Sequence, residues 1–114
     1  MIVLSEFIHQ ELGQKIIIAH PESQEELNQY YQLRHEILRA PWNQPPGSEK
    51  VNDDNSAIHL CLMIENLMAG VCRLHYNNAD EAQIRFMGVK AAYRNQKLGD
   101  YLMVAAENIS KSNH

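Results

Sequence analysis

Residues 84–102 read IRFMGVKAAYRNQKLGDYL, which is an apolar strand, a polar turn and the start of a helix. A turn of this kind presents unpaired backbone amides at the positive end of a helix dipole, an arrangement that suits a phosphate or pyrophosphate. Gly99 removes a Cβ where a ligand could approach closely, and Arg94 and Lys97 add cationic donors. The stretch therefore predicts an anion site, with an ordinary polar helix-capping turn as the alternative.

The residues before this stretch predict a strand and a long helix. Residues 14–20 contain three consecutive isoleucines between a glycine and a proline, which is typical of a strand. Ser23 and Glu26 have the spacing of a capping box, so a helix begins there. Apolar residues then recur at steps of three and four, and we expect the helix to run to about Ala40, just before Pro41.

Three strands follow in close succession, at residues 57–64, 68–76 and 82–89. Their connectors have hairpin length, so the strands should form an antiparallel meander. A second long helix begins at Leu98, where apolar residues again fall on one face. The predicted fold class is therefore α/β (α+β), in the order strand, helix, three antiparallel strands, helix.

The cysteines and histidines do not point to a metal or a disulfide framework. Two cysteines are too few for a disulfide scaffold, and neither they nor the six histidines have the spacing of metal ligands, so no metal is implied. If the first hairpin turns through Asn66 and Leu67, Cys61 and Cys72 become direct cross-strand neighbours. We expect two buried thiols that pack as small hydrophobic groups rather than a redox pair.

The chain as a whole has the size and composition of one domain, residues 1–114, with 45% hydrophobic residues. Within residues 1–13, the part that the patterns specify least, residues 5–12 are assigned to a short helix ended by Gly13. A net charge of −4 without a long basic run argues against nucleic acid. The start of the chain lacks the basic residues and long apolar stretch of a signal peptide, and no segment approaches the roughly 18 apolar residues of a membrane span. We therefore expect a cytoplasmic protein that does not enter a membrane.

Several stretches of the sequence resemble a known family. Residues 86–89 (FMGV) followed by residues 94–99 (RNQKLG) resemble the coenzyme A signature of GNAT acyltransferases, Arg/Gln-x-x-Gly-x-Gly/Ala. Residues 30–34, 44–49 and 82–87 are similar to the GNAT half of bacterial proteins that fuse this domain to a hotdog thioesterase. Together the similar segments extend over nearly the whole chain.

The resemblance implies a GNAT-like mixed sheet and acetyl-CoA, or another acyl-CoA, as cosubstrate. In that family the strand of the signature bonds the pantetheine amides through its backbone, as an added peptide strand would, and the loop wraps the pyrophosphate. Carried to this sequence, the strand residues that would hold pantetheine are Met87, Gly88 and Val89. The loop residues that would hold pyrophosphate, mainly through amides, are Arg94, Asn95, Gln96, Lys97, Leu98 and Gly99.

Two departures from the family pattern affect this transfer. Lys97 stands where the signature has its first glycine, so a side chain occupies a place where the backbone normally meets phosphate. The sequence also stops after the helix that follows the signature, whereas the family continues with further strands. The first of those strands normally splays from the one ending at Val89, and that part also carries the tyrosine that often protonates the departing thiolate. The sequence thus predicts a C-terminally shortened version of the fold.

The implied reaction is acetyl transfer from acetyl-CoA to a primary amine by direct attack. Glu81, Asp80 and His75 lie near predicted hairpin ends and are candidates for the base that deprotonates the amine, although charged residues there are usually only solvated. Arg34 fits a ligand contact and a snorkelling side chain equally well. Trp42 could line an acceptor pocket, but we expect it to anchor a loop onto the core.

The alternative to an enzyme is a non-catalytic module that binds coenzyme A or that dimerises. Residues 83–89 form an apolar strand that would lack its usual neighbour in the shortened fold, and an exposed strand edge is a template for pairing. We therefore expect a homodimer formed through this sheet edge.

Overall fold

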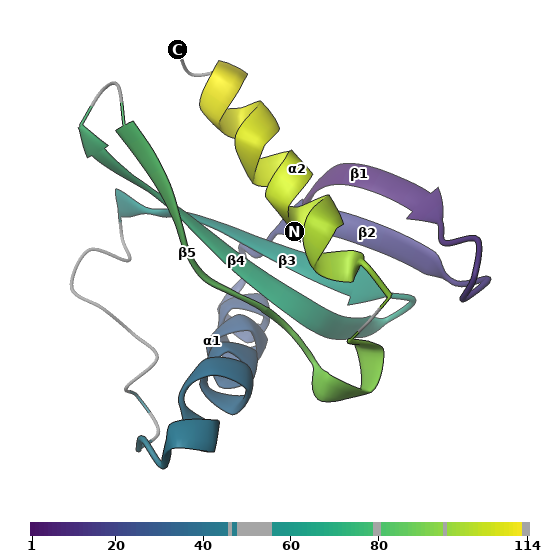
Figure 1. Ribbon diagram of the computed structural model, residues 1–114, viewed down its shortest axis with the longest axis horizontal. Helices are drawn as coiled ribbons and strands as arrows, with labels where there is room; N and C mark the ends of the chain where they lie inside the picture. Colours follow the sequence, from purple (N-terminus) through teal and green to yellow (C-terminus); the bar gives the residue numbers. More distant parts are fainter. Residues whose placement is uncertain (46, 48–55, 79–80, 95, 113–114) are drawn as a thin grey trace.

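The computed structural model describes residues 1–45, 47, 56–78, 81–94 and 96–112. Its elements follow in the order strand, strand, helix, short helix, three strands, short helix and helix (Figure 1). Their bounds are β1 (Ile2–Ile8), β2 (Lys15–His20), α1 (Gln24–Leu38), η1 (Ala40–Trp42), β3 (Ile58–Ile64), β4 (Leu67–Asn78), β5 (Glu81–Val89), η3 (Ala91–Tyr93) and α2 (Leu98–Ser112).

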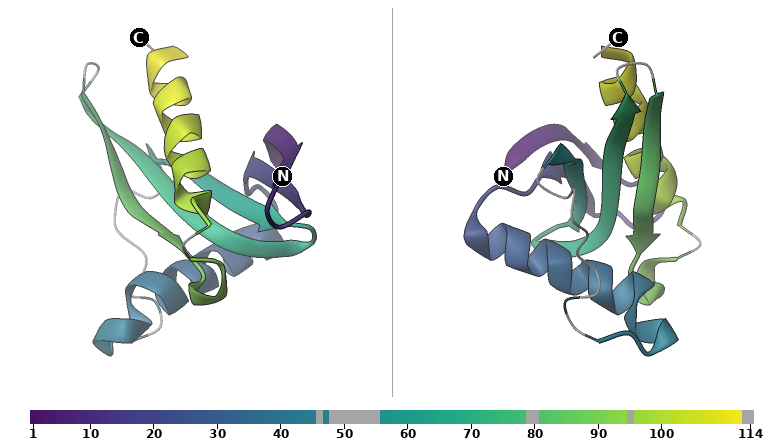
Figure 2. Two further views of the ribbon diagram at one scale, coloured as in Figure 1. Left: turned by 45° about the vertical axis from the view of Figure 1, so that its right-hand side comes forward. Right: turned by 90° about the vertical axis from the view of Figure 1, so that its left-hand side faces the viewer.

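The strands form one five-stranded sheet in the order β1-β2-β3-β4-β5, and every neighbouring pair is antiparallel. The two long helices lie on opposite faces of this sheet (Figure 2). On the α1 side the core contains Tyr30, Leu33 and Val71, and on the α2 side it contains Leu60, Leu98 and Leu102. The predicted α/β class and the predicted order from the strand at 14–20 onward are confirmed.

The amino-terminal segment is a strand, so the short helix predicted for residues 5–12 is wrong. β1 pairs with β2 from Ile2 opposite His20 to Ile8 opposite Lys15. An isolated helix of that length is marginal in water, whereas the open edge of β2 offers hydrogen-bond partners to the peptide groups on one side of an apolar strand. Gly13, with φ at 65°, turns the hairpin between the two strands instead of ending a helix.

The hairpin between β3 and β4 turns through Glu65 and Asn66, with φ at 52° for Glu65, one residue earlier than expected. A β-bulge between Leu62 and Met63 then shifts the register by one residue, so Cys72 lies opposite Leu60 and Cys61 lies opposite Val71. The predicted pairing of the two cysteines is wrong, because this register places them on opposite faces of the sheet. Both thiols are buried, as expected, and desolvation raises the pKa of each to about 12.

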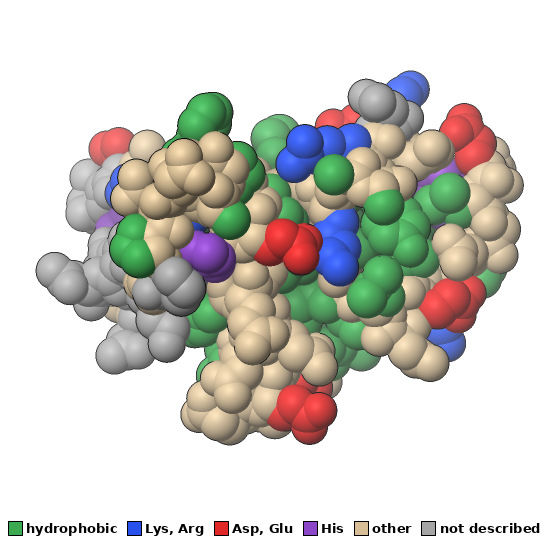
Figure 3. Space-filling view, turned by 90° about the horizontal axis from the view of Figure 1, so that it is seen from below, with side chains coloured by type: hydrophobic (Ala, Val, Ile, Leu, Met, Phe, Trp, Pro, Cys, Tyr) green, Lys and Arg blue, Asp and Glu red, His purple; other side chains and the backbone are tan. Residues whose placement is uncertain are grey.

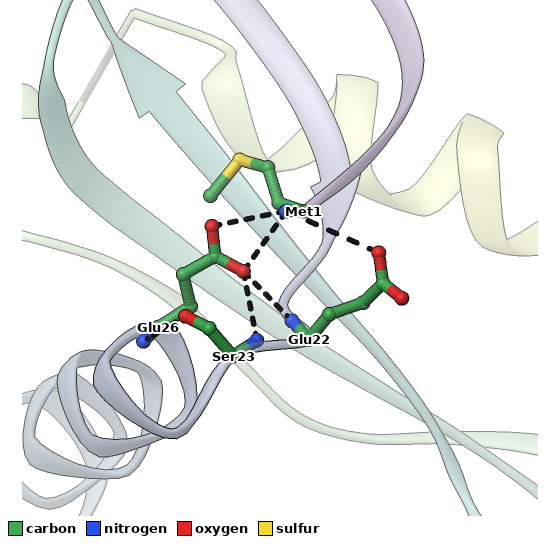
Figure 4. A network of polar contacts seen from close by, with 4 residues as sticks. All are labelled: Met1, Glu22, Ser23 and Glu26. Carbon is green, nitrogen blue, oxygen red and sulfur yellow. Dashed lines mark hydrogen bonds and ion pairs between the residues drawn. The ribbon is translucent and has the colours of Figure 1, made fainter.

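The capping box at the start of α1 is confirmed and is extended by a further cation. The Ser23 hydroxyl accepts from the Glu26 amide at 3.1 Å, and the Glu26 carboxylate accepts from the amides of Ser23 and Glu22 at 3.0 and 2.9 Å (Figure 4). The Met1 ammonium lies 3.0 Å from the same carboxylate. The amides of Glu22 and Ser23 and the ammonium lower the pKa of Glu26 to about 2.

We expect Glu26→Gln to destabilise the protein at neutral pH. A lowered folded-state pKa gives stability that is present above the ordinary pKa of about 4.5 and that is lost as pH falls toward 2. Glutamine keeps the hydrogen-bond acceptor, so the difference between variant and wild type should shrink across this pH window. Thermal unfolding between pH 2 and pH 7 measures it. Glu25→Gln, outside the capping box, is the control, and a difference that did not change with pH would contradict the assignment.

The carboxyl-terminal part of α1 packs directly on β5 at Gly88. A Cβ built on Gly88 would lie 2.6 Å from Ile37 Cγ2 and 3.4 Å from Leu38 Cδ2. Real Cβ atoms do not approach other atoms this closely, so a larger residue would push the helix away from the strand. The glycine therefore sets the distance between α1 and the edge strand.

We expect Gly88→Ala to lower the free energy of unfolding by about 1–3 kcal/mol, the usual cost of inserting a methyl group into a packed contact. Gly99→Ala is the matched control, because a Cβ on Gly99 meets nothing within 4 Å. Denaturant unfolding of both variants compares the two positions. Equal stabilities would mean that α1 can withdraw from β5 without cost.

Candidate functional site

The outer edge of β5 presents backbone groups to the surface. The Lys90 amide donates to the Ala69 carbonyl at 2.8 Å, so the backbone N–H of Lys90 points toward β4. Because backbone groups alternate in direction along a strand, the N–H and C=O of Val89 point away from β4, and those of Met87 follow the same side. Arg94 Nε donates to the Val89 carbonyl at 3.3 Å from this outer side, which agrees with that direction.

A bulge interrupts β5 next to these groups. The register with β4 shifts between Val71 and Arg73, and the unpaired region on β5 contains Phe86, whose φ of 53° is rare for an aromatic residue. The Arg34 guanidinium from α1 lies 4.5 Å from the centroid of the Phe86 ring. Arg34 is completely buried, so the snorkelling alternative does not apply. The buried Arg34 and the strained backbone of Phe86 thus lie at the bulge, next to Met87 on the outer edge of β5.

The loop between β5 and α2 contains a residue with a left-handed backbone conformation. Lys97 has φ at 61°, in the left-handed region that glycine favours, and its carbonyl accepts from the Asp100 amide at 3.2 Å. Leu98 is buried in the core and fixes the loop from below. Gly99 faces open space, which leaves room for a ligand against the first turn of α2. The lysine therefore adopts a backbone conformation that glycine would adopt more readily.

A pocket of ≈ 470 Å³ joins the end of β5 to the start of α2. It brings together two cationic side chains, Arg94 and Lys97, with the carboxylate of Asp100. Lys and Arg side chains gather on the underside of the molecule next to hydrophobic ones (Figure 3). The predicted site residues that line the pocket are Val89, Arg94, Lys97, Leu98 and Gly99.

The other predicted site residues lie around this pocket or outside it. Met87 and Gly88 lie further along β5, where Gly88 is covered by α1 on one face. Gln96 turns its carbonyl to His9, a residue of the β1–β2 turn that the sequence patterns did not single out. Asn95 lies outside the described residues. His9 was missed because its partner is distant in sequence and no local pattern joins the two.

Two of the candidate bases, Glu81 and His75, lie far from the bulge of β5. Glu81 is exposed at the first residue of β5, roughly 17 Å along the strand from Phe86 at about 3.4 Å per residue. His75 lies opposite Gln83, which is roughly 10 Å along the strand from Phe86. Asp80 lies outside the described residues.

Trp42 does not anchor its loop to the core, because 71% of its surface is exposed. Pro41 and Pro45 keep this region out of α1, and η1 carries the tryptophan away from the apolar face of the helix. The expected anchoring contact is therefore wrong.

A larger cavity of ≈ 580 Å³ lies elsewhere, between β1 and α2. Apolar side chains such as Leu4, Phe7 and Val104 line most of it, and no charged side chain does. It offers nothing to neutralise phosphate, so its size alone does not make it the site. Over the described ranges, neither helix is long and apolar enough to cross a membrane, and no three His, Cys, Asp or Glu side chains gather as metal ligands.

An open strand edge that leads into an amide-rich helix start can hold a long ligand with a peptide-like arm and a phosphate-bearing end. A profile of the acetyltransferase (GNAT) family matches residues 27–114. The chain therefore belongs to the GNAT acetyltransferase family. Members of this family use acyl-CoA as cosubstrate.

Solved structures show the same fold. Escherichia coli ElaA superposes with a TM-score of 0.70 at 18% identity, over 87% of this chain and 70% of that one. An acyl-CoA N-acyltransferase from Pseudomonas aeruginosa gives 0.66 at 22%, over 87% and 70%. An acetyltransferase of the GNAT family from Staphylococcus aureus Mu50 gives 0.68 at 18%, over 85% and 67%. The chain thus spans about two thirds of the length of these proteins.

Proposed function

We propose that this chain binds acetyl-CoA, or another acyl-CoA, along the outer edge of β5 and transfers the acyl group to a primary amine. The observation that carries the proposal is the continuity of the site. Outward-facing peptide groups at Met87 and Val89 lead directly into the pocket at the start of α2. The pantetheine arm has amides to pair with the strand, and the pyrophosphate has the charge that the pocket attracts.

The pyrophosphate lies in the pocket against the first turn of α2. The start of a helix leaves its first amides without an intrahelical i−4 partner, although that of Asp100 donates to the Lys97 carbonyl at 3.2 Å, and Gly99 lets a phosphate approach the backbone. Arg94 and Lys97 supply two positive charges, which outweigh the single carboxylate of Asp100 in the same pocket. The local charge therefore favours a dianionic ligand.

Arg94 changes partner when the cofactor binds. In the structure its Nε occupies the Val89 carbonyl, which is the acceptor that a pantetheine amide needs. Arg94 is exposed, so it can turn from this carbonyl to the phosphates at little cost. The side chain then exchanges one neutral acceptor for a charged one, which is the stronger hydrogen bond.

The thioester lies at the bulge, because the arm runs from the pocket past Val89 toward Met87. The amine nitrogen attacks the thioester carbonyl carbon, the carbonyl oxygen gains negative charge, and collapse of the intermediate expels the thiolate. The outward N–H of Met87 can donate to that oxygen. The proton of the amine passes to a base through water or directly. His75 and Glu81 remain candidates from the sequence, but they lie roughly 10 and 17 Å along the strands from the bulge, beyond the reach of one bridging water.

A non-catalytic module is the second candidate, and the absence of a described base beside the bulge, among residues 56–78 and 81–94, favours it. The same strand edge could serve coenzyme A binding or dimerisation alone. Thiol release measured with a panel of amines separates the two candidates, since a module binds the cofactor without turnover. The likeness to the GNAT half of hotdog-thioesterase fusions and the cytoplasmic location remain predictions from the sequence.

We expect calorimetric titration with acetyl-CoA to give saturable binding to the wild type and none to Gly99→Trp. The indole would fill the pocket, and the open space at Gly99 lets the protein fold around it. Gly99→Ala is the matched control and should bind nearly as the wild type does. Failure of the wild type to bind at millimolar ligand would refute the proposed site.

We further expect homodimerisation and cofactor binding to exclude each other. Both would use the outward peptide groups of β5, and each N–H or C=O pairs with one strand at a time. Sedimentation should show a dimer at high protein concentration that acetyl-CoA converts to a monomer. A monomer at every concentration would remove the dimer from the proposal, and a dimer insensitive to saturating ligand would place the interface elsewhere.

A further inference from the structure

We propose that His9 is a positioning residue for the pyrophosphate loop, acting through the carbonyl of Gln96. The inference rests on the proposed binding of acyl-CoA and adds to it a residue from the other end of the chain. His9 belongs to the turn that joins β1 to β2, and it is buried, with only 6% of its surface exposed.

The hydrogen bonds of His9 fix which ring nitrogen carries the proton. The Leu12 amide donates to Nδ1 at 3.1 Å, so Nδ1 is an acceptor without a proton. In the neutral ring the proton then lies on Nε2, which is 3.2 Å from the Gln96 carbonyl and donates to it. One imidazole therefore accepts from its own turn and donates to the loop that precedes α2.

Aromatic packing holds the same turn against α2. Tyr101, in the first turns of α2, lies edge-on to His9 with centroids 6.2 Å apart. It also contacts Phe7 of β1 at 4.6 Å. The β1–β2 hairpin thus braces both the loop and the helix start that form the candidate pyrophosphate pocket.

The carbonyl that His9 holds controls an amide in the pocket wall. In a trans peptide the C=O and the following N–H point in opposite directions. Since the Gln96 carbonyl points to His9, the Lys97 N–H points away from His9; Lys97 lines both the candidate pyrophosphate pocket and a smaller pocket on the His9 side, so the peptide that His9 holds belongs to the wall of each. Lys97 also has a left-handed φ that is costly for a residue with a side chain and persists only when its surroundings hold it. His9 supplies such a hold.

Two substitutions separate this role from a general structural one. In His9→Asn the short side chain can still accept from the Leu12 amide, as asparagine does in turns, but it cannot reach Gln96. In His9→Gln the longer side chain can place an amide donor at the Gln96 carbonyl. We expect His9→Asn to keep the unfolding temperature within a few degrees of wild type and to weaken coenzyme A binding roughly five- to tenfold, the factor of one ordinary hydrogen bond. His9→Gln should recover most of the loss.

The experiment is calorimetric titration of wild type and both variants with coenzyme A, with pantetheine binding followed by ligand-observed NMR. Pantetheine contacts the strand edge alone, so its affinity should be equal in all three proteins. Absence of coenzyme A binding to the wild type would overturn the proposed function together with this inference. Wild-type binding with an unaffected His9→Asn would overturn the inference alone, and so would an equal loss of coenzyme A and pantetheine affinity.

Discussion

The contact between α1 and β5 at Gly88 is the constraint on which the arrangement of the site depends. Ile37 reaches the strand backbone because no Cβ separates them, and this closes one face of β5. The same helix carries Arg34 over the Phe86 ring, at the bulge that breaks the register with β4. α2 packs on the other face of β5, where Met87 and Val89 contact its core residues, and the inner edge is paired to β4, so the outer edge is the side of Met87–Val89 left for a ligand. Packing on both faces therefore leaves the outer edge of β5 as the candidate binding surface.

The helix α2, whose start lines the candidate pyrophosphate pocket, packs on the opposite face of the sheet. Leu98 and Leu102 enter the core, and a Cβ on Gly70 would lie 3.1 Å from Leu102 Cδ1, so α2 also approaches the sheet through a glycine. Because Leu98 is the first residue of α2, its burial in the core fixes the position of the preceding loop relative to the sheet. Two glycine contacts, Gly88 with α1 on one face and Gly70 with α2 on the other, thus set how closely the two helices pack on the sheet.

The features that depend on a few adjacent residues could be predicted from the sequence. The features that depend on contacts between residues distant in sequence could not. The capping box at Ser23, the isoleucine-rich strand and the loop at 94–99 each carry their signal in a few adjacent residues. β1 depends on the open edge of β2, and the cysteine register depends on a turn through Glu65 and Asn66 rather than Asn66 and Leu67, together with a bulge between Leu62 and Met63. The burial of Arg34 and the bond from His9 to Gln96 join elements that no spacing rule connects. The candidate site was therefore predictable from local sequence, while the contacts that support it were not.

Lys97 illustrates how a departure from a signature can preserve its physics. A glycine at this position would adopt the left-handed conformation freely, whereas a lysine pays of order 1 kcal/mol or more to do so. That cost can be met by interactions that act only in the folded loop. The neighbouring peptide is held by His9, the next residue is buried, and the Lys97 carbonyl accepts from Asp100. In return the exposed side chain adds a positive charge beside the pocket, which glycine lacks. The substitution thus exchanges backbone freedom for electrostatic attraction, and the amino-terminal hairpin is what makes that exchange compatible with a defined loop.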